Sequence, residues 1–183
     1  MEQFMVEALR TAILTEKKSH DFYKYAAQLV SNSRVRDLFD FLAKEEVVHL
    51  QAFYEIFPEN CHGDIQSLMK QPINLDNPIY QALMDEVDID TRERQALEIS
   101  LREERACIDN YTIMVGCFRE PQMRGVFKMA LNDTYKHYKI IQKEYMRAMW
   151  MVEWLEQVNL CSLEHPGRIA RSDIGNRLKR LSK

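Results

Sequence analysis

The sequence predicts an all-α protein, a four-helix bundle made of two repeated helical hairpins. Two observations indicate this fold at once. Glycine and proline are scarce, with five of each in 183 residues, so long stretches contain no residue that breaks a helix. Apolar residues recur at helical spacing in four long segments. A third observation is that the second half of the chain repeats the first at a constant offset.

Four long helices are expected, over about residues 2–30, 35–57, 90–118 and 121–160. Pro58 ends the second helix, and Pro121 suits the first turn of the fourth. Asp90 and Glu93 have the spacing of a capping box at the start of the third helix.

The connection between the second and third helices is long. Residues 58–89 contain three prolines and a glycine, with one short helical piece at about 79–86. A crossover of this kind places two helical hairpins side by side. We therefore expect a bundle domain over residues 1–160 and a basic C-terminal tail over 161–183, with a short helix that opens at Ser172.

Composition excludes several functions. The net charge of -3 argues against nucleic acid as a partner, because phosphate neutralisation needs a basic surface. No apolar run is long enough to predict a transmembrane segment, and the N-terminus has no signal-peptide pattern. The four cysteines form no CxxC pair, so no rubredoxin or zinc-ribbon module is predicted. Scattered free cysteines favour a cytoplasmic location.

The two hairpins repeat each other at an offset of 88 residues, from Glu16 to Glu104 for example. The segment ALRTAILTEKKSHDFY aligns with ALEISLREERACIDNY, and the same register continues into the second helix of each hairpin. The matched pairs include Glu16 with Glu104, Asp21 with Asp109, Tyr23 with Tyr111, Phe39 with Phe127 and His49 with His137.

Acidic residues and a histidine stand in helical rows that are otherwise apolar. A helix nearly repeats its facing every seven residues, so the residues of one row point the same way. The rows are Leu9, Glu16, Tyr23, Val30; Phe39, Glu46, Phe53; Leu42, His49, Ile56; and Leu97, Glu104, Tyr111, Phe118. We expect each of these acids, and the histidine, to face the core.

Carboxylates and imidazoles that meet in a core need a cation. Burial of one unpaired carboxylate is costly, and a metal ion supplies the opposing charge. Glu46 and His49 form a Glu-x-x-His pair, whose spacing puts both side chains on one helix face. Bundles with a carboxylate-bridged pair of metals use such pairs. The alternative is that the acids are solvated and that the histidines are hydrogen-bonded core residues.

In this order, the segments TEKKSHDFY, LAKEEVVHL, REERACIDNY and LNDTYKHYKIIQKEY resemble the ferritin-like superfamily, in particular its rubrerythrin-type branch, over about residues 5–145. The resemblance implies a ferritin-like fold with two iron ions, or another divalent metal such as zinc or manganese. The ligands that it implies are Glu16, Glu46, His49, Glu104 and His137. It also implies hydrogen bonds from Tyr23 and Tyr111 to ligand carboxylates, with ordinary core packing as the alternative.

Two positions depart from the family pattern. Thr134 stands where the second Glu-x-x-His pair would have its glutamate, so a bridging carboxylate is missing. Asp133 is a candidate substitute, and its alternative is a surface aspartate paired with a lysine. Cys107 occupies the place of a further glutamate of rubrerythrin-type peroxidases, three residues after Glu104. These departures argue against a standard rubrerythrin peroxidase.

The resulting hypothesis is a di-iron, or more generally dimetal, oxidoreductase or iron-handling protein that acts on dioxygen, peroxide or ferrous iron. Its ligands are assigned as Glu46 and Glu104 for the bridges, Glu16 and His49 for one ion, and His137 with Asp133 or water for the other. We expect tighter binding on the side of Glu16. The alternative is a degenerate member that binds one metal or none and has a structural or interaction role.

An apolar cluster near the end of the fourth helix predicts a partner. The cluster consists of Met146, Met149, Trp150, Trp154 and Val158. The connector or a second subunit could cover these side chains, and we expect a homodimer in which this helix contributes to the interface.

Overall fold

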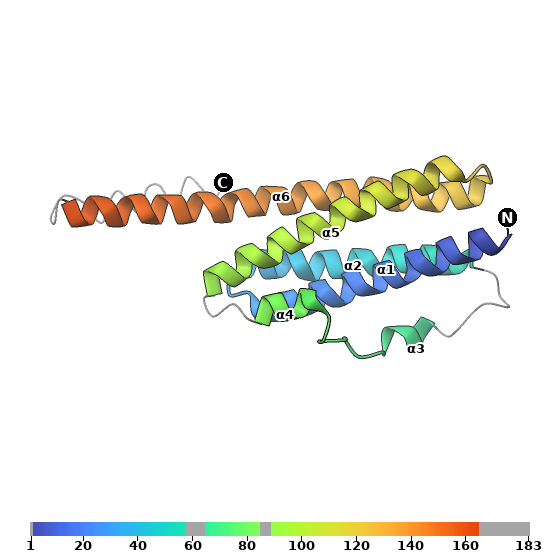
Figure 1. Ribbon diagram of the computed structural model, residues 1–183, viewed down its shortest axis with the longest axis horizontal. Helices are drawn as coiled ribbons and strands as arrows, with labels where there is room; N and C mark the ends of the chain where they lie inside the picture. Colours follow the sequence, from blue (N-terminus) through green and yellow to red (C-terminus); the bar gives the residue numbers. More distant parts are fainter. Residues whose placement is uncertain (1, 58–64, 85–88, 165–183) are drawn as a thin grey trace. The chain divides into compact units, whose positions relative to one another are not determined.

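The computed structural model describes the backbone of residues 2–57, 65–84 and 89–164, and side chains within 3–57, 65–84 and 92–150. Every regular element in these ranges is a helix (Figure 1). The helices are α1 (Glu2–Leu29), α2 (Ser33–Glu55), α3 (Ile65–Met69), α4 (Pro78–Met84), α5 (Ile89–Cys117) and α6 (Pro121–Glu164). The all-α prediction is thus confirmed, with four long helices close to the expected bounds.

The chain forms two compact units, residues 1–145 and 146–183. The first unit contains α1 to α5 and the first part of α6, and it holds the candidate site.

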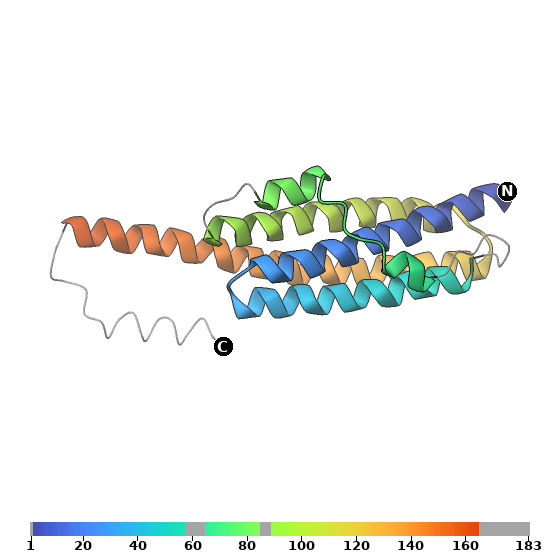
Figure 2. The ribbon, with the colours of Figure 1, turned by 90° about the horizontal axis from the view of Figure 1, so that it is seen from below.

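The first hairpin consists of α1 and α2, which lie side by side in both views (Figures 1 and 2). Three residues, 30–32, separate the two helices. Asn32 caps α2, because its side-chain oxygen accepts a hydrogen bond from the backbone nitrogen of Arg34 at 3.1 Å. Arg36, on α2, donates a hydrogen bond to the carbonyl of Val30 at 3.1 Å and so also stabilises the turn.

The second hairpin consists of α5 and α6 and has the same construction. Three residues, 118–120, separate its helices. Glu120 caps α6, since its carboxylate accepts hydrogen bonds from the backbone nitrogens of Gln122 at 3.0 Å and Met123 at 2.6 Å. Pro121 is the first residue of α6, as predicted. The repeat therefore extends to the position and length of the turns.

The crossover between the hairpins packs against α1. The predicted helical piece corresponds to α4, whose Tyr80 is buried with its ring 6.3 Å from that of Phe22 and 5.3 Å from that of Tyr25. Lys17 donates a hydrogen bond to the carbonyl of Gln71 at 3.4 Å. The five-residue helix α3 was not predicted, because IQSLM is too short for a periodic pattern.

A polar contact joins the two hairpins near the start of α5. The side-chain amide of Asn32 donates a hydrogen bond to the carboxylate of Glu93 at 3.2 Å. Glu93 thus contacts the turn of the first hairpin. Asp90, the other residue of the predicted capping box, has its side chain outside the described range.

The predicted rows face the core. All members of the rows through Glu16 and Glu104 are buried, and so are those of the row through Glu46. In the row through His49, only Ile56 is half-buried. The apolar members of these rows bury large surface areas, which is the main driving force for assembling the bundle.

The second compact unit begins within α6, which continues to Glu164 where an end at about residue 160 was expected. Met146 and Trp150 are 49% and 66% exposed. The side chains of Trp154 and Val158, and the predicted helix at Ser172, lie outside the described residues. Among the described helices, none combines the length and the apolar character that a membrane span requires.

Candidate metal centre

Four long helices each contribute to one buried polar cluster. Glu16 lies on α1, Glu46 and His49 on α2, Glu104 on α5 and His137 on α6. The exposed fraction of each of these residues is between 1% and 4%. The structure therefore brings together five of the six residues that sequence analysis predicted as metal ligands.

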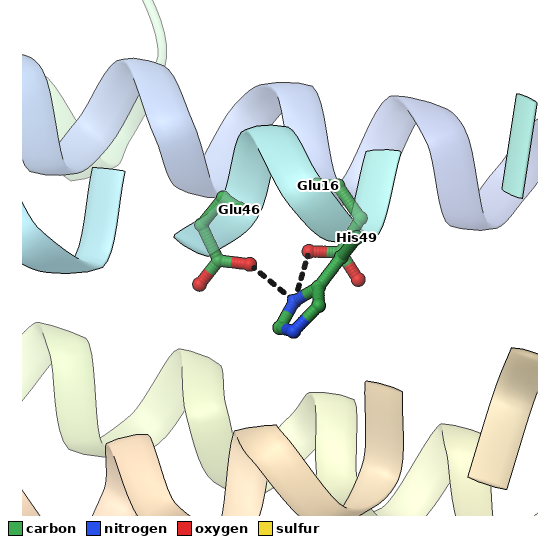
Figure 3. Close-up of side chains that lie close together, drawn as sticks. All are labelled: Glu16, Glu46 and His49. Carbon is green, nitrogen blue, oxygen red and sulfur yellow. Dashed lines mark hydrogen bonds and ion pairs between the residues drawn. The ribbon is translucent and has the colours of Figure 1, made fainter. Parts of the chain in front are cut away.

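The first group within the cluster contains Glu16, Glu46 and His49. The Nδ1 atom of His49 lies 3.1 Å from Oε2 of Glu46 and 3.6 Å from Oε2 of Glu16. Figure 3 shows both carboxylates turned toward the same nitrogen of the imidazole. One ligand atom from each residue lies within 4.8 Å of the others, which is close enough for all three to contact one metal ion.

The second group contains Glu46, Glu104 and His137. The Nδ1 atom of His137 lies 3.5 Å from Oε1 of Glu46 and 3.7 Å from Oε1 of Glu104. Glu46 belongs to both groups and directs a different oxygen to each histidine. Glu104 belongs to the second group alone, where it has the place that Glu16 has in the first.

Each tyrosine of the repeat donates a hydrogen bond to a carboxylate of the opposite hairpin. The hydroxyl of Tyr23 donates a hydrogen bond to Oε1 of Glu104 at 2.5 Å. The hydroxyl of Tyr111 donates one to Oε1 of Glu16. Burial and the nearby carboxylates raise the pKa of both tyrosines well above 10.0, so both remain donors. The predicted hydrogen bonds to Glu16 and Glu104 are confirmed.

Without a metal, protons compensate the charge of the cluster. Burial acts to lower the pKa of His49, but hydrogen bonds and charges of Glu16 and Glu46 raise it to about 11. The pKa of His137 rises to about 9 against the same effect of burial, because of Glu104 and Glu46. Both imidazoles are therefore cationic at neutral pH in the metal-free protein, and a metal ion has to displace their protons.

The three carboxylates differ in the net direction of their pKa shifts. Burial raises the pKa of Glu16, and the charge of Glu46 raises it further. Burial also raises the pKa of Glu104. Burial acts on Glu46 in the same direction, yet its close contacts with Glu16 and the two histidines lower its pKa overall. Glu46, between the two histidines, therefore carries the most persistent negative charge.

Thr134 occupies the place of a second shared carboxylate. It is buried, with an exposed fraction of 3%, and lies three residues before His137 as Glu46 lies three before His49. Its hydroxyl donates a hydrogen bond to the carbonyl of Ala130 at 2.8 Å. Among the described residues, Nδ1 of His137 is the one buried side-chain nitrogen or oxygen without a hydrogen-bond partner.

Asp133 lies beside His49, whereas sequence analysis offered it as a ligand next to His137. Its Oδ2 atom is 3.6 Å from Nε2 of His49, and its Oδ1 atom accepts a hydrogen bond from Lys136 at 2.5 Å. It belongs to neither group of prospective ligands. Nδ1 of His49 faces the carboxylates of the first group and Nε2 faces Asp133, an arrangement that orients metal-binding histidines in proteins.

Cys107 lies near the cluster on α5 and is half-buried. Burial, and then the charges of Glu16 and Glu104, raise the pKa of its thiol. The thiol therefore stays protonated in the metal-free protein, and Cys107 belongs to neither group of prospective ligands. Cys117 is free and exposed, while Cys61 and Cys161 have side chains outside the described residues.

A buried lysine that the sequence did not predict follows Glu16 on α1. Lys17 is 6% exposed and forms an ion pair with Asp21, one helical turn later. The repeat contains the signal, because Arg105 and Asp109 form the corresponding pair at 3.2 Å on α5. The second pair is exposed, whereas Lys17 of the first pair also contacts the crossover through the carbonyl of Gln71.

The residues present fit a pair of divalent metal ions. Three buried carboxylates and two imidazoles match the donors that iron, manganese and zinc take in proteins. The orphaned Nδ1 of His137 faces two of the carboxylates, so an ion there would satisfy it. The shared Glu46 places the two groups side by side.

Comparisons with known proteins agree with this description. A family model described as Rubrerythrin matches residues 7–145. A solved two-domain protein from Anabaena variabilis, with dj-1/thij/pfpi-like and ferritin-like domains, superposes with a TM-score of 0.63 at 18% identity. The match covers 80% of this chain and 40% of that one, and it supports the fold alone. No curated protein matches the chain.

Proposed function

The chain belongs to the rubrerythrin family of ferritin-like proteins, and from that premise we propose that it binds two metal ions, as a di-iron or dimetal oxidoreductase or iron-handling protein. The observation that carries the proposal is the pair of buried ligand groups that share Glu46. Buried carboxylates without a compensating cation are costly, and two metal ions would supply that charge.

In the proposed centre, one ion is bound by Glu16 and His49 and the other by Glu104 and His137. Glu46 would take part in holding both ions, because its two oxygens face different histidines. This assignment changes the sequence-based one, in which Glu104 was a bridge and Asp133 a ligand. Iron is the metal that we propose, since carboxylate oxygens and imidazole nitrogens suit it. When bound, the ions would supply redox steps with dioxygen, peroxide or ferrous iron.

The chain's own residues hold the centre and control its protons. Tyr23 and Tyr111 fix the orientation of the outer carboxylates, Glu104 and Glu16, through hydrogen bonds that no titration near neutral pH removes. Asp133 orients His49 from behind. The apolar rows above and below the cluster keep water out, which strengthens the electrostatic contacts inside.

The test is metal content and reactivity. Metal-free protein loaded with ferrous iron without oxygen should bind two ions per chain, and admission of oxygen or peroxide should oxidise them. Glu46→Gln should lose both ions, while the half-buried neighbour variant Glu45→Gln should keep them. Wild-type protein that binds no metal under these conditions would contradict the proposal.

One observation favours the alternative of a structural or interaction protein. The cluster can neutralise itself with protons, since the pKa values of His49 and His137 rise to about 11 and 9. Thr134 also removes one ligand. On this alternative the protein keeps its melting temperature and its partners when chelators have removed every metal ion.

We also propose a homodimer and a cytoplasmic location. The homodimer rests on the exposure of Met146 and Trp150 at 49% and 66%. Sedimentation at micromolar concentration should give a dimer, and Trp150→Glu should shift it toward monomer. A wild-type monomer would contradict this part of the proposal.

A further inference from the structure

The two halves of the metal centre differ at one buried position of the repeat. In the first half, the residue three before the histidine is Glu46, and its carboxylate lies 3.1 Å from Nδ1 of His49. In the second half that residue is Thr134, whose hydroxyl is bonded to the carbonyl of Ala130. The corresponding nitrogen, Nδ1 of His137, has no hydrogen-bond partner.

The charge balance of the metal-loaded site indicates that one negative group is missing. Two divalent ions would bring four positive charges against the three negative charges of Glu16, Glu46 and Glu104, with both imidazoles neutral. The loaded site would keep one positive charge in a buried place, and such a charge is unfavourable without a counter-ion. A fourth carboxylate at position 134 would have balanced the site. Asp133 does not replace it, because it pairs with Lys136 and faces His49.

We propose that a small exogenous anion of the carboxylate class completes the loaded centre beside Thr134 and His137. The missing group is one carboxylate, so the anion should be no larger than the end of a glutamate side chain. Formate and bicarbonate have this size and charge, and acetate is slightly larger. This inference rests on the proposed function, because the anion would bind only once the second metal ion is present.

Binding of the anion and of the second metal ion should be coupled. An anion that binds only the loaded site must strengthen metal binding by the same factor by which the metal strengthens anion binding. We expect formate to raise the affinity for the second ion by about 5–150-fold, the usual range of such coupling. The affinity for the first ion should change much less.

The experiment uses the full chain, freed of metal by a chelator and titrated with Zn²⁺ or Co²⁺. Titrations are carried out with formate or with perchlorate at equal ionic strength, and a chromophoric chelator reports the affinity for each ion. Elemental analysis reports the number of ions bound. Separate titrations with bicarbonate, acetate and benzoate measure size selection and distinguish bicarbonate from organic carboxylates as the stronger ligand. Benzoate should have no effect.

Three variants locate the anion. Thr134→Glu should bind the second ion tightly without formate and should not respond to it. Thr134→Gln fills the same space without charge, so it should respond to formate weakly or not at all and should bind the second ion weakly. Thr112→Glu is the matched control, because Thr112 also donates its hydroxyl to a helix carbonyl, at 2.7 Å, but lies exposed. It should keep the full response to formate.

The outcomes separate this inference from the proposed function. Two tightly bound ions with no response to formate, bicarbonate or acetate would overturn the inference and leave the proposed function intact. An equal response in the wild type and in Thr134→Glu would also overturn it, since the anion would then bind elsewhere. A wild type that binds no metal would overturn the proposed function and the inference together. The wild-type titrations decide the matter even if a variant at Thr134 fails to fold.

Discussion

The two halves of the metal centre lie on equivalent helices of the repeat, but the side chains around their histidines differ. In the half of Glu16 and His49, the imidazole contacts two carboxylates and has Asp133 behind it. In the half of Glu104 and His137, the imidazole nitrogen that faces the carboxylates has no hydrogen bond. Helix geometry thus repeats the placement of a site, while a single residue such as Thr134 changes the chemistry of one copy.

The most severe change is expected at Glu46, the residue that both halves share. Glu46→Gln should lose both ions, whereas Glu16→Gln and Glu104→Gln should each lose one. Loss of a direct ligand should weaken binding by more than the roughly 10–100-fold that changes around a metal site cause. Elemental analysis after identical metal loading measures the effect. A Glu46→Gln protein that keeps one ion in either half would contradict the sharing of this carboxylate.

The pH dependence of stability should have opposite signs without and with metal. The pKa values of His137 and His49 in the folded metal-free protein, about 9 and 11, lie above the ordinary value of 6.5. A raised pKa gives stability that is complete below pH 6.5 and is lost as the pH rises through the folded value. We therefore expect metal-free protein to lose on the order of 3–6 kcal/mol between pH 6.5 and 9.

Urea denaturation at several pH values measures this change. Metal-loaded protein should become more stable over the same interval, because fewer protons compete with the ions. His137→Gln should remove much of the loss that occurs up to pH 9, and His49→Gln should remove more of the loss that occurs above it. Metal-free protein whose stability rises steadily from pH 6.5 to 9 would show that the two imidazoles are neutral.

The two tyrosines should act on opposite halves. Tyr23→Phe removes the hydrogen bond to Glu104, and Tyr111→Phe removes the hydrogen bond to Glu16. Each variant should lose about 1–3 kcal/mol of stability, as is usual for a buried bond to a charged group. Each variant should also lower the affinity for the metal ion bound by the carboxylate it affects, by roughly tenfold. Chelator competition measures the affinities, and Tyr25→Phe is a control outside the cluster. Equal weakening of both ions by both variants would contradict the crossed arrangement.

The smallest effect is expected at Asp133, which is partly exposed and paired with Lys136. Asp133→Asn should lower the affinity for the metal ion at His49 by a few-fold to roughly tenfold, and the affinity for the ion at His137 should not change. If Asp133 were instead the substitute ligand beside His137, the loss would fall on the side of His137. Lys136→Met, which removes the partner of Asp133, serves as the comparison. A selective loss of the ion at His137 would restore the sequence-based assignment.

Sequence analysis reached the fold and the membership of the cluster for identifiable reasons. Proline and glycine placed the breaks, so the bounds of α2, α5 and α6 were predicted closely at their starts or ends. Rows at seven-residue spacing placed Glu16, Glu46 and Glu104 among apolar side chains, and all three are buried. The 88-residue repeat added His137, which no row had indicated.

The partners within the cluster depended on contacts between helices. A row gives the direction in which a side chain leaves its own helix, but it does not say which residue of another helix it meets. For this reason the sequence does not say that Asp133 faces His49, and it does not predict the buried pair of Lys17 and Asp21. Which side chains enter the core can be read from the amino-acid sequence, because helical periodicity is local. That Glu46 faces both histidines follows only from the packed bundle, since distances between helices depend on how all of them pack.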